Sequence, residues 1–123
     1  MTDQSEQIAK AFTDHYYPTF DQNRGALAGL YSDQSVLCFE GQKVQGTQAI
    51  VSKLTSLPFQ RCQHKVTSLD SHAVPSGGVL VFVTGQLLTE GESRPMPFSQ
   101  VFHLANISGS WVVTNDIFRL NYG

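Results

Sequence analysis

From residue 61 onward the chain consists of four strand-like runs separated by short turns, and this pattern leaves few folds open. The runs are rich in Val, Leu, Ile, Phe and Thr, whereas Gly, Pro, Ser and Asn gather between them. The predicted strands cover 61–73, 78–90, 97–107 and 110–121. Parallel neighbours need long crossover connections, so connections this short predict an antiparallel meander.

Both faces of these predicted strands are apolar, although an antiparallel sheet covered on one side alternates apolar and polar residues. In the second run, Val79, Val81, Val83 and Leu87 face one way and Leu80, Phe82 and Leu88 the other. In the third run, one face carries Phe98, Phe102 and Leu104 and the other carries Val101, Ala105 and Ile107. In the fourth run, one face carries Trp111, Val113 and Ile117 and the other carries Val112, Phe118 and Leu120. Helices can cover one face, and a second copy of the sheet is the simplest cover for the other. The sequence therefore predicts a homodimer; the alternative is a one-sided sheet with ordinary strand formers outside.

The first half of the chain is predicted to be mainly helical. Apolar residues three to four apart between residues 4 and 20 predict an amphipathic helix. Pro18 lacks an amide proton and crowds the preceding turn, so this helix is expected to bend or end near Tyr17. Further expected elements are a helix over 24–30, a strand over 36–40 turning at Gly41, and a helix from Gly46 or Thr47 to Pro58. Helices before a sheet predict one α+β domain over residues 1–123.

Composition and charge exclude several classes of function. Lysine and arginine occur singly and the net charge is −2, which argues against a nucleic-acid-binding surface. No apolar run approaches the roughly 20 residues of a membrane span, and the polar start MTDQSEQ does not resemble a signal peptide. Only 15% of the residues are charged, which is low for a small protein and indicates that a partner covers part of the surface.

Motifs for nucleotide, metal or nucleophilic chemistry are missing from the sequence: it contains no phosphate-binding glycine loop, GxSxG, CxxC or HExxH. We therefore predict neither a cofactor nor a metal. The histidines lack metal-ligand spacing and are expected to be core or surface residues; they are His15, His64, His72 and His103. Cys38 and Cys62 lie in predicted strands and are expected to be reduced core thiols, with a redox pair as the alternative.

A small-molecule enzyme is the main functional alternative, because a curved sheet packed on helices can enclose a pocket. Tyr16 or Tyr17 would supply a phenol donor and Glu40 a carboxylate base, as in ketosteroid isomerases of similar architecture. Glu40, however, lies beside Gly41 at a strand end, where a carboxylate stays solvated and ionised. Catalysis of this isomerase or dehydratase kind is therefore not the function we predict.

Five segments, taken in order, resemble the nuclear transport factor 2 family along nearly the whole chain. They are HYYPTFDQNR (15–24), LYSDQSVLCFEGQKVQG (30–46), IVSKLTSLPFQRCQH (50–64), FSQVFHL (98–104) and TNDIFRLNYG (114–123). The resemblance implies a cone of curved antiparallel sheet packed on N-terminal helices and dimerising through the sheet. It also implies a non-catalytic carrier that binds the GDP form of Ran and contacts phenylalanine-glycine repeat nucleoporins. Such a carrier would be found in the cytoplasm, the nucleus and the nuclear pore complex; a dimerisation module of another complex is a further alternative.

The resemblance further implies which residues bind Ran. Three carboxylates would surround an apolar pocket, and they fall on Glu40, Glu90 and Glu92, although the family more often has aspartates at the last two positions. The implied pocket-lining residues are Phe39, Leu57, Phe59, Leu87, Met96 and Phe118. An aromatic side chain of Ran would enter the pocket while neighbouring basic residues pair with the carboxylates.

Contact with nucleoporin repeats is implied by the same resemblance but with a departure from the family pattern. The family commonly has a large aromatic residue near the start of the first helix, where this chain has Ser5. Loss of such a ring removes about 150–250 Å² of potential contact area. Ile8 and Tyr122 would still contribute, so repeat binding is predicted but weaker than in relatives that carry the aromatic residue.

Overall fold

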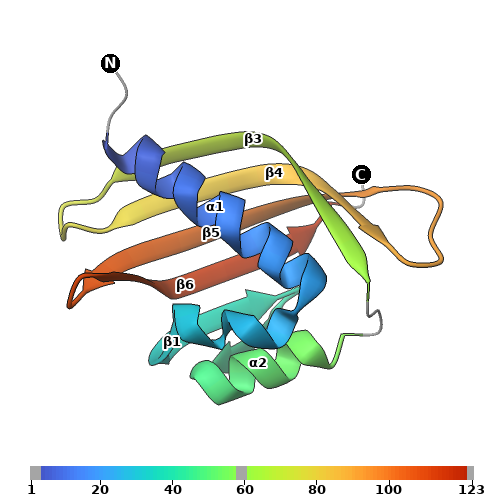
Figure 1. The fold of residues 1–123 in the computed structure, drawn as a ribbon, viewed down its shortest axis with the longest axis horizontal. Coiled ribbons are helices and arrows are strands. Elements are labelled where there is room, and N and C mark those ends of the chain that lie inside the picture. Colours follow the sequence, from blue (N-terminus) through green and yellow to red (C-terminus); the bar gives the residue numbers. More distant parts are fainter. Residues whose placement is uncertain (1–3, 58–60, 122–123) are drawn as a thin grey trace.

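The computed structural model describes residues 4–57 and 61–121, which form one layer of helices against one sheet (Figure 1). The helical elements of this part are α1 (Gln4–Gln22), the 3-10 helix η1 (Arg24–Leu30) and α2 (Thr47–Thr55). The strands are β1 (Tyr31–Phe39), β2 (Gln42–Gln45), β3 (Cys62–Ala73), β4 (Val79–Thr89), β5 (Met96–Ile107) and β6 (Ser110–Leu120). The α+β prediction is confirmed. None of the described helices is long and apolar enough to cross a membrane.

The sheet has the strand order β2-β1-β6-β5-β4-β3, and its last four strands form the predicted antiparallel meander. β1 differs, because it pairs in parallel with β6 while β2 pairs with it antiparallel. The parallel pair is possible because α2 and the strands β3 to β5 lie between β1 and β6 in the chain and supply the long crossover. The four-residue strand β2 was not predicted from the sequence.

The first helix is continuous across Pro18 and extends to Gln22, so of the two predicted outcomes, a bend or an end near Tyr17, the end is wrong. A proline inside a helix costs about 3 kcal/mol. The aromatic side chains around it, Tyr16, Tyr17 and Phe20, are all buried, between 1% and 5% exposed. Burial of one side chain of this size contributes roughly 1.5–3 kcal/mol. The three together outweigh the proline and keep this segment helical.

The core lies between α1 and the concave face of β3 to β6, which the helix crosses diagonally (Figure 1). Phe102 of β5 is fully buried, and its ring contacts those of Phe12 and Tyr16 with centroid separations of 4.8 and 4.9 Å. Buried residues of β4 alternate with half-buried or exposed ones, as expected for a strand with one face on the core. The alternation predicted for β4 and β5 is confirmed.

The opposite face of the sheet carries exposed apolar side chains. They are Phe82, Leu88, Ile107 and Ile117, between 37% and 50% exposed. In β6 the predicted faces were partly wrong, because Val113 is buried on the core side whereas Ile117 lies on the outer face. The β5–β6 register shifts where His103 pairs with Asn115 and Leu104 pairs with Val113, and such a bulge reverses the alternation. The predicted dimer through this face stays a prediction.

Candidate functional site

An apolar pocket of about 360 Å³ opens where the ends of β1, β4, β5 and β6 meet the residues that follow α2. It is lined by Phe39, Leu57, Leu87, Thr89, Glu90, Glu92, Met96, Phe118 and Leu120. The structure thus brings together five of the six predicted lining residues and two of the three predicted carboxylates. The sixth lining residue, Phe59, lies outside the described residues.

The positions of the apolar residues at the pocket floor follow from how the strands pair. Phe39 and Phe118 are register partners in the parallel β1–β6 pair, and their rings stack with a centroid separation of 4.7 Å and an interplanar angle of 7°. Phe118 also stacks on the fully buried ring of Phe98 at 5.5 Å. Leu87 and Met96 are partners in the β4–β5 hairpin. These contacts hold the apolar groups in place before any ligand arrives.

Glu90 and Glu92 lie on the turn between β4 and β5, and both are exposed. Gly91 adopts φ +84°, a conformation that favours glycine, and the Glu92 amide donates to the Thr89 carbonyl at 3.1 Å. The Arg61 amide lies 3.4 Å from Glu90 Oε1. This tight turn therefore presents two carboxylates at the edge of the pocket.

Glu40, the third predicted carboxylate, lies on the turn between β1 and β2, next to the pocket rather than in its lining. Its carboxylate accepts a hydrogen bond from the backbone amide of Leu120, which does line the pocket. Its own amide donates to the Phe118 carbonyl at 3.1 Å. Glu40 has φ +51°, a left-handed conformation that glycine would adopt at lower cost. The turn thus holds a charged residue in an unfavourable conformation beside the pocket.

A lysine also lies at this end of the molecule. The Lys53 ammonium is 5.9 Å from the centroid of the Phe39 ring and donates a hydrogen bond to the side chain of Gln42. The lysine comes from the last turn of α2, where a positive charge is favourable to the helix dipole. The resemblance implied only the acidic residues of this rim, so Lys53 was missed.

A second carboxylate environment, also missed from the sequence, lies inside the core. Asp116 is 1% exposed; its Oδ2 accepts from Tyr31 at 2.8 Å and its Oδ1 from Gln100 at 2.7 Å. Burial raises the pKa of Asp116 to about 6, although these hydrogen bonds oppose the shift. The hydroxyl of Tyr16 lies 3.4 Å from Asp116 Oδ2, and that of Tyr17 donates to Gln100 at 2.8 Å.

The hydrogen-bond network around Asp116 contains the two tyrosines, either of which would supply the phenol donor in the enzyme alternative. Tyr16 and Tyr17, which the alternative pairs with Glu40, direct their hydroxyls to the buried network. Burial, reinforced by the negative charge of Asp116, also raises the pKa of Tyr16 well above its ordinary value. These groups satisfy one another within the core, as a structural polar cluster does.

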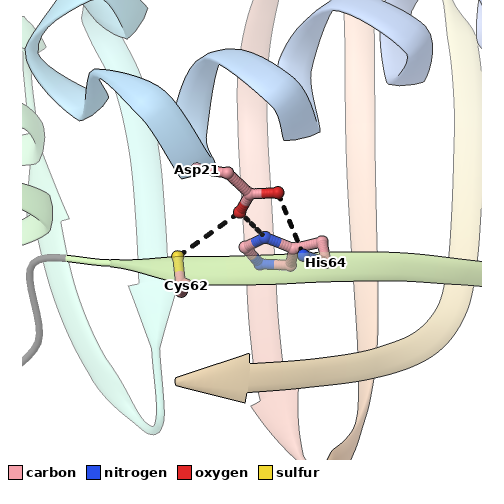
Figure 2. A group of neighbouring side chains, drawn as sticks. All are labelled: Asp21, Cys62 and His64. Carbon is pink, nitrogen blue, oxygen red and sulfur yellow. Dashed lines mark hydrogen bonds and ion pairs between the residues drawn. The ribbon is translucent and has the colours of Figure 1, made fainter. Parts of the chain in front are cut away.

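A third group of side chains joins the end of α1 to the start of β3 (Figure 2). Cys62 and His64 are two residues apart on one strand, so both face the helix. Asp21 Oδ1 lies 2.6 Å from His64 Nδ1 and 3.3 Å from Cys62 Sγ. The other carboxylate oxygen, Oδ2, accepts a hydrogen bond from the His64 backbone amide at 3.0 Å. Burial, and then the Asp21 charge, raise the pKa of the Cys62 thiol to about 12.

The two cysteines are free thiols. The His64 side chain, 1% exposed, packs in the core against the rings of Tyr17, Phe20 and Phe98. The available sequence signal was the spacing Cys-x-His, which places both side chains on one face of a strand. The position of Asp21 depends on long-range packing, which spacing alone does not reveal.

The residues implied for nucleoporin repeats are only partly described. Ser5 is 3% exposed, and Ile8 is half-buried against the core. Tyr122 lies outside the described residues. In a single copy of the chain Ser5 and Ile8 offer little apolar surface, and the role of all three positions in repeat binding stays a prediction.

Comparison with known proteins matches residues 8–120 to the Nuclear transport factor 2 (NTF2) domain. Nuclear transport factor 2B of Arabidopsis thaliana is 56% identical over 119 residues, which are 95% of this chain and 94% of that protein. Nuclear transport factor 2 of Schizosaccharomyces pombe is 52% identical over 117 residues, which are 94% of this chain and 95% of that protein. A solved structure of nuclear transport factor 2 from Cryptosporidium parvum, 45% identical, matches with a TM-score of 0.91 over 98% of each chain.

These relatives are named as transport factors and not as enzymes, so the prediction that the chain is not an enzyme is confirmed. High identity over nearly the full length of each relative also confirms the resemblance found in the sequence. The chain belongs to the nuclear transport factor 2 family.

Proposed function

We propose that this protein binds the GDP form of Ran through the pocket at the end of the sheet and carries it into the nucleus. The observation that carries the proposal is the association of an apolar pocket with carboxylates at its edge. Relatives that are named nuclear transport factor 2 support a nucleocytoplasmic transport role. In the proposal, the pocket is where the partner is held.

The pocket is suited to one aromatic side chain. An apolar cavity of about 150 Å³ holds benzene in another protein, and this pocket of about 360 Å³ exceeds that volume. Insertion of a phenylalanine from Ran would contribute roughly 1.5–3 kcal/mol. The stacked rings of Phe39 and Phe118 give the inserted ring a preformed aromatic wall.

The carboxylates would pair with basic residues that flank the inserted aromatic side chain. The carboxylate of Glu40 is held beside the pocket by the Leu120 amide. A charge-assisted hydrogen bond to Glu40 would contribute about 1.5–3 kcal/mol when water is excluded, whereas an ion pair with an exposed carboxylate contributes less. Ran holds its switch segment differently when GTP is bound, so selectivity for GDP would arise as a difference in affinity between two conformations.

The experiment that tests the proposal is a pull-down of Ran-GDP at low salt with the Glu40→Lys variant. We expect binding to be lost, because the substitution reverses the charge beside the pocket. Asp33→Lys is the matched control, since Asp33 is exposed near the other end of β1 and undergoes the same charge change. Wild-type binding by Glu40→Lys, with both variants folded, would contradict the proposal.

The proposed carrier acts as a homodimer. The exposed apolar side chains on the outer face of the sheet, among them Phe82 and Ile117, support a second copy as the cover for this face. Sedimentation at micromolar concentration should give twice the mass of the chain, and Ile117→Lys should shift it toward the monomer. A monomeric wild-type protein would exclude this part of the proposal.

Passage through the pore would depend on weak contacts with phenylalanine-glycine repeats, for which Ser5, Ile8 and Tyr122 are the implied residues. An NMR titration with a repeat peptide should show weak binding that Ser5→Trp strengthens. Equal binding by the two proteins would count against this placement. The transport role implies that the protein is found in the cytoplasm, the nucleus and the nuclear pore complex.

A further inference from the structure

We propose that Asp21, Cys62 and His64 form a binding site for a thiophilic divalent cation, with Zn²⁺ as the best match. This site is separate from the proposed binding of Ran, so either can fail without the other. It depends on three side chains from two elements that converge on one point (Figure 2).

The three donors lie close enough to share one ion. One ligand atom from each residue can be chosen so that all lie within 4.8 Å of one another. A tetrahedral zinc site with Zn–S of about 2.3 Å and Zn–N of about 2.0–2.1 Å places sulfur and nitrogen roughly 3.5 Å apart. The 2.6 Å contact between Asp21 and His64 would open by less than about 1 Å as the ion replaces their hydrogen bond.

The chemical types of the three donors select the ion. A thiolate, an imidazole and a carboxylate are all zinc ligands, and three protein ligands leave a fourth position for water. A hard cation such as Mg²⁺ would instead prefer oxygen donors only. On binding, the Cys62 thiol releases its proton to solvent and the sulfur coordinates the metal as a thiolate.

The site is accessible from outside. Asp21, Cys62 and His64 line a surface hollow together with Pro18, Gln22 and Gln63, so the fourth position can face water. Two guanidinium groups oppose a cation here: Arg61 lines the same hollow, and the guanidinium of Arg24 lies near the Cys62 thiol and favours the thiolate. The same guanidinium lies over the Phe20 ring at 5.6 Å. It would assist deprotonation of the thiol but repel the ion, so we expect a moderate affinity.

A bound ion would connect the C-terminal end of α1 to the first residues of β3. Cys62 is the register partner of Thr89, which lines the apolar pocket beside Glu90. The ion would therefore restrain a part of the sheet next to the pocket. Because it binds only the folded arrangement of these donors, it would also raise the melting temperature.

The test is a titration of the tag-free, reduced full-length protein with Co²⁺, which reports tetrahedral thiolate ligation by its absorption. We expect one equivalent to produce intense visible bands and a sulfur-to-cobalt charge-transfer band, both displaced by Zn²⁺. Cys62→Ser should weaken binding at least about ten-fold and abolish the charge-transfer band. Cys38→Ser is the matched control and should behave as wild type, because Cys38 lies on β1 and takes no part in the cluster.

Thermal unfolding with and without Zn²⁺ gives a second readout. The ion should raise the melting temperature of wild type and Cys38→Ser but not that of Cys62→Ser. If the serine variant does not fold, Asp21→Asn takes its place, with the exposed Asp14→Asn on the same helix as its control. The proposal is overturned if wild type gives no charge-transfer band, or if the band persists in Cys62→Ser.

Discussion

The protein holds carboxylates in two contrasting environments, one in the core and one at the pocket. Asp116 is 1% exposed and receives hydrogen bonds from Tyr31 and Gln100, so its partners come from within the chain. Glu92 lies exposed on a turn at the pocket edge. Glu40 lies between these extremes, since one backbone amide fixes it beside the pocket. The comparison shows that Asp116 has its hydrogen-bond partners within the core, whereas Glu92 is exposed to solvent at the edge of the pocket.

The largest expected effect is on stability when the core carboxylate is removed. Asp116→Ala removes the acceptor that the Tyr31 hydroxyl and the Gln100 amide share, and a buried donor left unsatisfied costs about 1–3 kcal/mol. We expect the free energy of unfolding to fall by about 3 kcal/mol or more, measured by urea denaturation. Glu92→Ala is the control and should stay within roughly 0.5 kcal/mol of wild type. Equal effects of the two substitutions would remove the distinction between the environments.

The pH dependence of stability is expected to show the same distinction. Burial raises the pKa of Asp116 from 3.8 to about 6, so the folded state holds this proton more tightly than the unfolded state. Stability should therefore decrease as pH rises from about 4 to 6, by an amount on the order of 3 kcal/mol. The measurement is the difference in unfolding free energy between wild type and Asp116→Asn across this range. A difference that does not change with pH would contradict the predicted shift.

The smallest expected effect is at the exposed edge of the pocket. Glu92→Gln removes one charge from an exposed turn, where an ion pair contributes about 0.2–1 kcal/mol. We expect Ran-GDP binding to weaken by no more than about five-fold, measured by calorimetry, while Glu92→Asp keeps the charge and stays near wild type. A complete loss of binding in Glu92→Gln would contradict the small contribution expected of this exposed residue.

Much of the sheet and of the pocket could be predicted from the sequence. Val81 and Val83 on the core side of β4, and Phe82 on its outer side, follow from strict alternation along a strand. The pocket residues Phe39, Leu57 and Phe118 came from the family resemblance, and the structure brings them together. Their role in binding Ran stays a prediction.

Other features could not be predicted, because they depend on register or on distant contacts. The bulge near Thr114 interrupts the alternation of β6, so nothing local places Asp116 on the core side. The helix continues past Pro18 because burial of aromatic side chains against the sheet outweighs the local tendency of proline to end a helix. The contact of Asp21 with Cys62 joins residues that are far apart in the chain, and only the packing of α1 on β3 brings them together.

The most direct test of the proposed function is calorimetric titration of the wild-type protein with Ran loaded with GDP and, separately, with GTP. If an aromatic side chain presented only by the GDP conformation enters the pocket between Phe39 and Phe118, only Ran-GDP should give a saturable binding isotherm at micromolar concentration. Equal affinity for both forms, or no binding to Ran-GDP, would contradict the assignment of this pocket.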